Sequence, residues 1–228
     1  MSATEVGHEI ERHHAGRTKE EEERHDRIIA IVEASLLAIV AVLAAWSGYS
    51  SAKWSTESRL KLAQASTQRT EAATHQLAAL TQRNFDSSTF TVWFVAYVAG
   101  NTQKMAIAER RFTPNFRRAF DAWMATNPET NPNAPPGPTY MPQYKQPDAA
   151  QAAALNRKAD LLYTQGSIDG THSDDYVRVT IYLATVLFLL ALSGHFRVRS
   201  VRIGLVVVSI VALGLAVSQL VVLPLPPA

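Results

Sequence analysis

The stretch IIAIVEASLLAIVAVLAAW, residues 28–46, decides the fold of this chain, because an apolar run of this length predicts a membrane-spanning helix. Two further apolar runs of similar length follow, VTIYLATVLFLLALSGHF at 179–196 and IGLVVVSIVALGLAVSQLVVL at 203–223. A helix rises about 1.5 Å per residue, so each run can cross a hydrocarbon core of roughly 30 Å. The sequence therefore predicts an integral membrane protein with three transmembrane helices.

The composition narrows the class of protein. A net charge of +2 over 228 residues is too small to indicate a nucleic-acid partner, and the lack of cysteine excludes disulfides and thiolate metal sites. The motif HEIERH at 8–13 spaces its histidines five residues apart, whereas a zinc-binding helix needs four. The sequence has no Gly-rich phosphate loop, nucleophile elbow or suitably spaced carboxylate pair. We therefore expect a protein that is not an enzyme and needs no cofactor or metal.

Residues 1–27 form a polar segment of mixed charge ahead of the first apolar run. A cleaved signal peptide has a short basic leader and an apolar core of about 7–15 residues. Here the leader is long and acidic and the apolar run is longer, so we expect an uncleaved signal anchor. The small residues Ala44 and Ala45 keep cleavage open as the alternative.

Basic residues predict the orientation of the three helices. The turn 197–202 between the second and third runs carries three arginines and no acid, and Arg24 and Arg27 flank the first run. Arginine and lysine in short flanking loops mark the cytoplasmic side of a membrane. The N-terminus is then cytoplasmic, and residues 47–178 and the tail 224–228 lie outside.

A shorter apolar segment, TFTVWFVAYVAG at 89–100, raises the alternative of a fourth span. Runs of 10–14 apolar residues more often form a buried core helix or an interfacial segment. A fourth span would also place the arginine turn outside, against the charge rule. We therefore expect three spans.

The external segment begins with residues that favour helix. Residues 50–82 hold no Pro or Gly, so a long helix is predicted to continue from the first span through 47–82. Residues with a 3–4 spacing along it suggest a heptad seam, namely Leu60, Ala63, Thr67, Thr70, Thr74 and Leu77. An independent coiled coil and packing against the chain's own returning helix both explain this spacing, and the second is favoured because only two positions are Leu.

Further helices are expected beyond this one. Asp86 or Ser87 can cap a helix that runs to about residue 111, and Thr113-Pro114 resembles a helix start with Phe116, Phe120 and Trp123 on one face. A Pro-rich loop follows at 127–147. An Ala-rich helix, 149–165, is expected to end at Gly166 before a polar loop at 167–175. The predicted fold class is all-α, with an external helical domain over 47–178.

Glu33 is the one charged residue inside a predicted span, which makes it a candidate intramembrane polar site. It lies near the cytoplasmic end of its run, where it can reach interfacial water or pair with one of the arginines of the turn: Arg197, Arg199 or Arg202. A structural role is favoured, and a proton or ion pathway is the alternative. Small residues at a four-residue spacing predict a helix-packing face on the same run: Ala30, Ala34 and Ala38.

Two surfaces of the external segment are candidates for contact with partners. One is the apolar segment around Phe90, Trp93, Phe94 and Tyr97. The other is a basic cluster near Glu109, made of Lys104, Arg110, Arg111, Arg117 and Arg118. Anionic lipid headgroups or a polyanion suit such a cluster, but a salt-bridged solvated face is the more common explanation.

Three stretches resemble a family of uncharacterised bacterial three-span inner-membrane proteins. They are AAWSGYSSAKWS at 44–55, SDDYVRVTIYLATVLFLLALSG at 173–194 and ERRFTPNFRRAFDAW at 109–123. The resemblance covers about a fifth of the chain. It implies the same three-span layout and a bacterial inner membrane, and it carries over no catalytic or binding residue.

Two functions are compatible with the sequence. The first is a non-enzymatic inner-membrane scaffold, sensor or interaction module, which associates with itself and possesses a surface for a membrane-protein partner. The second is an oligomeric channel for an ion or small solute, with Glu33 near the cytoplasmic mouth. Three spans are too few to enclose a pore alone, so the channel requires oligomerisation.

Overall fold

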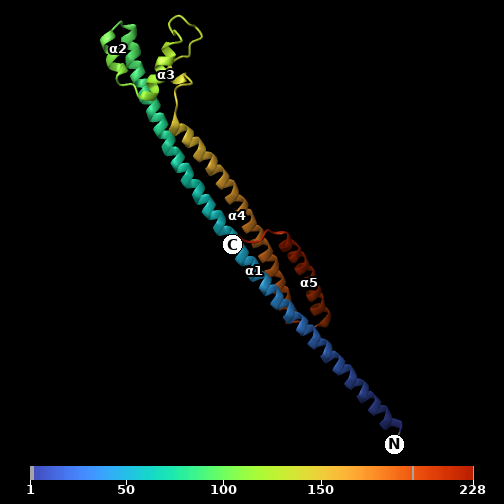
Figure 1. Cartoon of the computed structure of the whole chain (residues 1–228). Coiled ribbons are helices and arrows are strands. Elements are labelled where there is room, and N and C mark those ends of the chain that lie inside the picture. Colours follow the sequence, from blue (N-terminus) through green and yellow to red (C-terminus); the bar gives the residue numbers. More distant parts are fainter. Residues whose placement is uncertain (1–2, 197, 228) are drawn as a thin grey trace. The chain divides into compact units, whose positions relative to one another are not determined.

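The computed structural model describes residues 3–196 and 198–227, and the side chains from Arg24 onward except those of residues 25, 26 and 199. Over these residues the chain is helical and has no strand, which confirms the predicted all-α class (Figure 1). The helices are α1 (Ala3–Val98), α2 (Thr102–Glu109), α3 (Pro114–Met124), a short 3₁₀ helix η1 (Pro138–Tyr140), α4 (Pro147–Ser193) and α5 (Arg199–Val222).

Helix α1 is longer than predicted. It includes the first apolar run and the predicted helix over 47–82, and it continues to Val98 without a second start at Asp86 or Ser87. No Gly or Pro interrupts the chain between Gly48 and Gly100, so the sequence offers no breaker at residue 86. The helix stops where Gly100 adopts a φ of 65°, a left-handed conformation that glycine adopts readily. Asn101 then caps α2 by accepting a hydrogen bond from the backbone N–H of Lys104.

Helix α4 is also longer than predicted. The predicted stop at Gly166 and the predicted loop at 167–175 are wrong, because α4 runs from Pro147 to Ser193 without a break. Gly166 instead lies in the contact with α1, where its carbonyl accepts a hydrogen bond of 2.7 Å from Ser58 Oγ. A methyl group on Gly170 would lie 3.3 Å from the same hydroxyl oxygen. These glycines permit close helix contact and do not end the helix.

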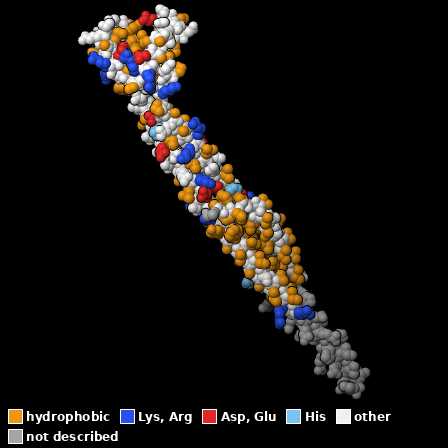
Figure 2. Space-filling model, viewed as in Figure 1, with side chains coloured by type: hydrophobic (Ala, Val, Ile, Leu, Met, Phe, Trp, Pro, Cys, Tyr) orange, Lys and Arg blue, Asp and Glu red, His pale blue; other side chains and the backbone are white. Residues whose placement is uncertain are grey.

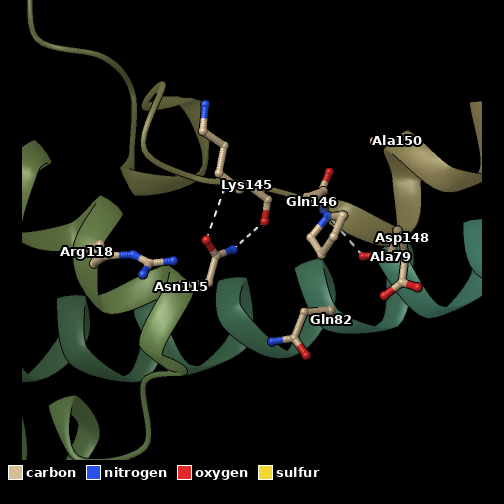
Figure 3. A pocket seen from close by; sticks show the side chains of 9 residues that line it. Ala79, Gln82, Asn115, Arg118, Lys145, Gln146, Asp148 and Ala150 are labelled. Carbon is tan, nitrogen blue, oxygen red and sulfur yellow. Dashed lines mark hydrogen bonds between the residues drawn. The ribbon is translucent and has the colours of Figure 1, made fainter.

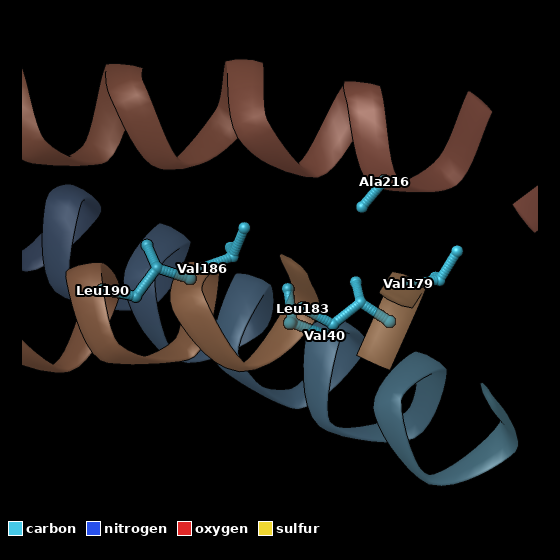
Figure 4. Packing of buried hydrophobic residues seen from close by; sticks show 6 residues of the cluster. All are labelled: Val40, Val179, Leu183, Val186, Leu190 and Ala216. Carbon is cyan, nitrogen blue, oxygen red and sulfur yellow. The ribbon is translucent and has the colours of Figure 1, made fainter. Parts of the chain in front are cut away.

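The chain divides into two compact units, with the boundaries between Leu60 and Lys61 and between Gln165 and Gly166. In the first unit, the N-terminal part of α1, the C-terminal part of α4 and all of α5 are each long and apolar enough to cross a membrane. Their shared core consists of six buried residues, which Figure 4 shows: Val40, Val179, Leu183, Val186, Leu190 and Ala216. Many other apolar side chains of these helices face outward, as the hydrophobic surface in Figure 2 shows.

In the second unit, residues 61–98 of α1 pack along the first turns of α4. The buried positions of α1 recur every seven residues at Ala65, Ala72 and Ala79, and those of α4 are Ala152 and Ala159. The predicted seam is therefore in the wrong register: both of its leucines, Leu60 and Leu77, are more than half exposed. Alanine occupies the contact because a short side chain lets two helix backbones approach closely.

The rest of the second unit, residues 86–146, is called the head below. Helix α3 begins as predicted, with Thr113 Oγ1 accepting a hydrogen bond from the backbone N–H of Phe116 and Pro114 in the first turn. Its predicted aromatic face is buried at Phe116, Phe120 and Trp123. The Pro-rich loop at 127–147 contains only η1 before α4 begins.

Candidate functional sites: a buried ion pair and an aromatic head

The first site joins all three helices of the first unit, which is called the apolar unit below. Glu33 of α1 is buried, and its Oε1 accepts hydrogen bonds of 2.8 Å from Arg202 Nε and 2.9 Å from Ser193 Oγ. Arg202 Nη2 bonds the second carboxylate oxygen, so the guanidinium grips both oxygens. Ser193 ends α4 and Arg202 lies in the first turn of α5. The carboxylate thus ties the end of α4 and the start of α5 to α1.

Sequence reasoning placed the partner of Glu33 among three arginines, and the structure selects Arg202. Arg197 lies outside the described residues, and so does the side chain of Arg199. Arg202 lies in the first turn of α5. Sequence reasoning missed Ser193, because nothing near it in the chain signals a carboxylate partner 160 residues away.

The predicted packing face on α1 is not the face that the chain itself buries. Ala30, Ala34 and Ala38 are all exposed, whereas Glu33 and Val40 of the same helix are buried. The small residues that do face α4 are serines that the sequence analysis did not single out. Ser47 Oγ donates a 2.9 Å hydrogen bond to the carbonyl of Tyr176, and Ser51 contacts Ser173.

The second site is the aromatic core of the head. Trp93 is 2% exposed and stacks on Tyr97, and its ring meets Phe120 edge-on with a centroid distance of 4.8 Å. Phe90 is half-buried in the same cluster, so three of the four side chains predicted as an interaction surface fill the head's own core. Phe94 alone of the four is exposed. The predicted interaction surface is therefore mostly buried, because the aromatic side chains on this face of α1 pack against the aromatic face of α3.

The head also contains a fully buried carboxylate, Asp86, next to the first turn of α3. It accepts hydrogen bonds of 2.9 Å from Thr113 Oγ1 and 2.8 Å from Tyr144 Oη, and both its oxygens lie 3.2 Å from Gln82 Nε2. Burial and the neighbouring carboxylate raise the pKa of the Tyr144 phenol. Asp86 therefore ties α1 to the cap of α3 and to the Pro-rich loop.

The members of the predicted basic cluster differ in whether they form a salt bridge. Arg117 forms salt bridges of 3.1 Å with Glu109 and 3.0 Å with Asp121, and Glu109 also accepts a hydrogen bond from Trp93 Nε1. The other four members are exposed: Lys104, Arg110, Arg111 and Arg118. Among the described residues, the salt bridges of the head use Arg117 alone from this cluster. The cluster is thus partly a salt-bridged face and partly free positive charge.

Two of the open depressions of the second unit have different linings. One of about 600 Å³ lies beside the start of α4. There the side-chain Nδ2 of Asn115 donates to the Lys145 carbonyl and its Oδ1 accepts from the Lys145 backbone N–H, while the Lys145 amine points away from Arg118 (Figure 3). The other, of about 430 Å³, is called the α1–α2 groove. It is lined by Thr91, Val92, Val95, Ala96, Ala99, Asn101, Lys104, Ile107, Ala108 and Arg111.

Comparison with known proteins finds no match for this chain. No protein-family model matches this chain, and no curated protein or solved structure is detectably similar to it. The functional reading of the chain therefore rests on its own residues and their geometry.

Proposed function

We propose that this protein is a non-enzymatic interaction module anchored in a bacterial inner membrane by its three apolar helices. In this proposal the head lies on the extracytoplasmic side, and copies of the chain associate with one another. The apolar outward-facing surface of the first unit supports membrane insertion, because a soluble chain rarely exposes so extended an apolar surface. The arginine turn supports the orientation.

The observation that carries the interaction role is the exposed apolar surface of the head. The head already has a dense aromatic core, yet Val92, Val95 and Val98 at the end of α1 remain 55%, 63% and 72% exposed. Figure 2 shows hydrophobic and basic side chains together on the surface of the head. Since these valines are not needed by the core, their exposure indicates a surface that a partner covers.

The geometry of Glu33 favours this role over the channel. A carboxylate that accepts or releases an ion needs an open coordination position, but both oxygens of Glu33 are engaged by Arg202 and Ser193. A bidentate pair of this kind holds helices together. We therefore expect the ion flux across liposomes that contain the wild-type protein to equal the flux across liposomes that contain the Glu33→Gln variant.

Site-specific photo-crosslinking in living cells tests the interaction role. A photoreactive amino acid at Val95 is expected to give discrete adducts, identified by mass spectrometry as one partner or as a second copy. The matched control is Asn133, which is exposed in the Pro-rich loop and lies outside both the groove and the aromatic core. Equal labelling at the two positions, or no adduct at Val95, would contradict the proposal.

A further inference from the structure

The geometry points to a specific occupant of the α1–α2 groove: an acidic amphipathic helix of a partner protein. This inference rests on the proposed function, since it names the chemistry of the partner that the head binds. Three properties of the groove support it, namely its apolar floor, its positive rim and its dimensions.

The floor of the groove is apolar and unfilled. Val92 and Val95 of α1 face it together with Ile107 of α2, and these side chains are 55%, 63% and 47% exposed. The lining also includes three alanines, Ala96, Ala99 and Ala108. Small side chains beside larger ones make a recess that branched apolar side chains of a ligand can fill.

The rim of the groove is positive. Lys104 and Arg111 line it, the remaining polar members Thr91 and Asn101 are uncharged, and the lining includes no acidic residue. A ligand whose apolar stripe is flanked by Asp or Glu therefore gains charge complementarity on binding. A second copy that docked the same face would bring Lys104 and Arg111 against their own counterparts, and like charges in contact oppose that arrangement.

The dimensions suit a helix better than a flat surface. The lining residues from the end of α1 and the turn directly after it run from Thr91 to Ala99, which at helical rise corresponds to about 12 Å and a little over two turns. A ligand helix that lies along it presents apolar residues at positions i, i+3, i+4 and i+7. A lipid bilayer also offers apolar and anionic groups, but a flat bilayer leaves a concave recess unfilled.

Synthetic peptides test the inference on the full-length protein in nanodiscs of zwitterionic lipid. Three fluorescent peptides of about 18 residues are compared by anisotropy. The first carries a leucine stripe flanked by Glu, the second has Lys in place of Glu, and the third has the composition of the first in scrambled order. We expect the Glu-flanked peptide to bind at least about tenfold more tightly than either of the others.

Matched variants locate the binding. The double variant Lys104→Glu with Arg111→Glu is expected to reverse the preference between the Glu and Lys peptides. Val95→Asp is expected to weaken the Glu peptide about tenfold or more. Arg118→Glu removes an exposed positive charge outside the groove and is expected to leave binding unchanged. Near-ultraviolet circular dichroism of the aromatic core verifies that each variant is folded.

Several outcomes would overturn the inference: equal binding of the ordered and scrambled peptides, an equal effect of Arg118→Glu and the groove variants, or no binding at all. In a further outcome, anionic phosphatidylglycerol vesicles bind the protein through Lys104 and Arg111 and the Glu peptide does not bind. The ligand of the groove would then be an anionic bilayer and not a helix. If Val95 adducts still form in cells in any of these cases, the interaction role stands and only the acidic helix fails.

Discussion

Glu33 shows how one residue can hold three helices together. Its carboxylate is buried and bonded to both Ser193 and Arg202, so loss of its charge leaves the guanidinium with a weaker partner. We expect Glu33→Gln to lower the stability of the apolar unit by about 1–3 kcal/mol. Thermal unfolding in detergent micelles, followed by helical circular dichroism, measures this loss.

The control for this prediction removes both charges. A buried ion pair replaced by apolar residues of similar volume is often neutral in stability. The double variant Glu33→Leu with Arg202→Leu is therefore expected to melt closer to the wild-type protein than Glu33→Gln does. If Glu33→Gln melts with the wild-type protein, the ion pair does not stabilise the fold.

Tyr144 makes the stability of the head depend on pH. Its pKa in the folded protein is raised above the usual value of about 10, so the folded state favours the neutral phenol that donates to Asp86. This contribution is fully present below pH 10 and is lost as the pH rises further, because the unfolded state releases the proton first. Chemical denaturation of the head at a series of pH values above 9 measures the loss.

The variant Tyr144→Phe separates this effect from general alkaline unfolding. It is expected to cost about 1–2 kcal/mol at pH 7, where a donor to a buried carboxylate is lost, and to weaken the alkaline dependence. Tyr140→Phe is the matched control, because Tyr140 is 62% exposed in the same loop. Identical pH profiles for both variants would mean that the Tyr144 hydroxyl does not couple to folding.

At the scale of the elements, the contact between α1 and α4 depends on small side chains. Ala72 is 1% exposed within it, while its neighbour Ala73 faces solvent. Ala72→Leu is expected to lower stability by about 1–3 kcal/mol through overpacking, measured by urea unfolding. Ala73→Leu should change stability by less than about 0.5 kcal/mol, since Ala and Leu have similar helix propensity. Equal effects at the two positions would place the buried seam elsewhere.

The exposed alanines of α1 bear on self-association. Ala30, Ala34 and Ala38 lie outside the core of the apolar unit, so their spacing remains available to a second copy. Ala34→Phe is expected to shift the mass of the protein in native detergent measurements toward the monomer, because bulk prevents close helix contact. Ile39→Phe adds bulk on another side of α1 and should leave the mass unchanged. An oligomer that tolerates Ala34→Phe would place the contact on another face.

At the scale of the whole molecule, chemical labelling can measure the proposed orientation of the chain in the membrane. The chain has no cysteine, so single cysteines at exposed positions report on sidedness without background. In spheroplasts, Asn133→Cys in the Pro-rich loop is expected to react with a membrane-impermeant maleimide. Ser200→Cys at the start of α5 should react only after permeabilisation. The reverse pattern would place the arginine turn outside and contradict the orientation.

The parts of the fold that were predicted correctly have local causes. The apolar runs, the all-α class and the start of α3 at Thr113-Pro114 each follow from neighbouring residues. The errors involve contacts between distant segments. Gly166 reads locally as a helix stop, but inside α4 it meets Ser58, which lies 108 positions earlier. Asp86 reads as a helix cap, but its partners Thr113 and Tyr144 come from other elements.

By itself, the sequence determined that this chain has three helices apolar enough to span a membrane, because length and hydropathy are local properties. It also indicated that Glu33 either reaches interfacial water or pairs with one of three arginines. Only the tertiary structure decided which of them pairs with it, which face of α1 is buried, and that Trp93 fills a core while Val95 faces outward. The physical reason is that a local apolar or charged pattern does not say which segment distant in the sequence packs against it, and that packing decides which side chains are covered.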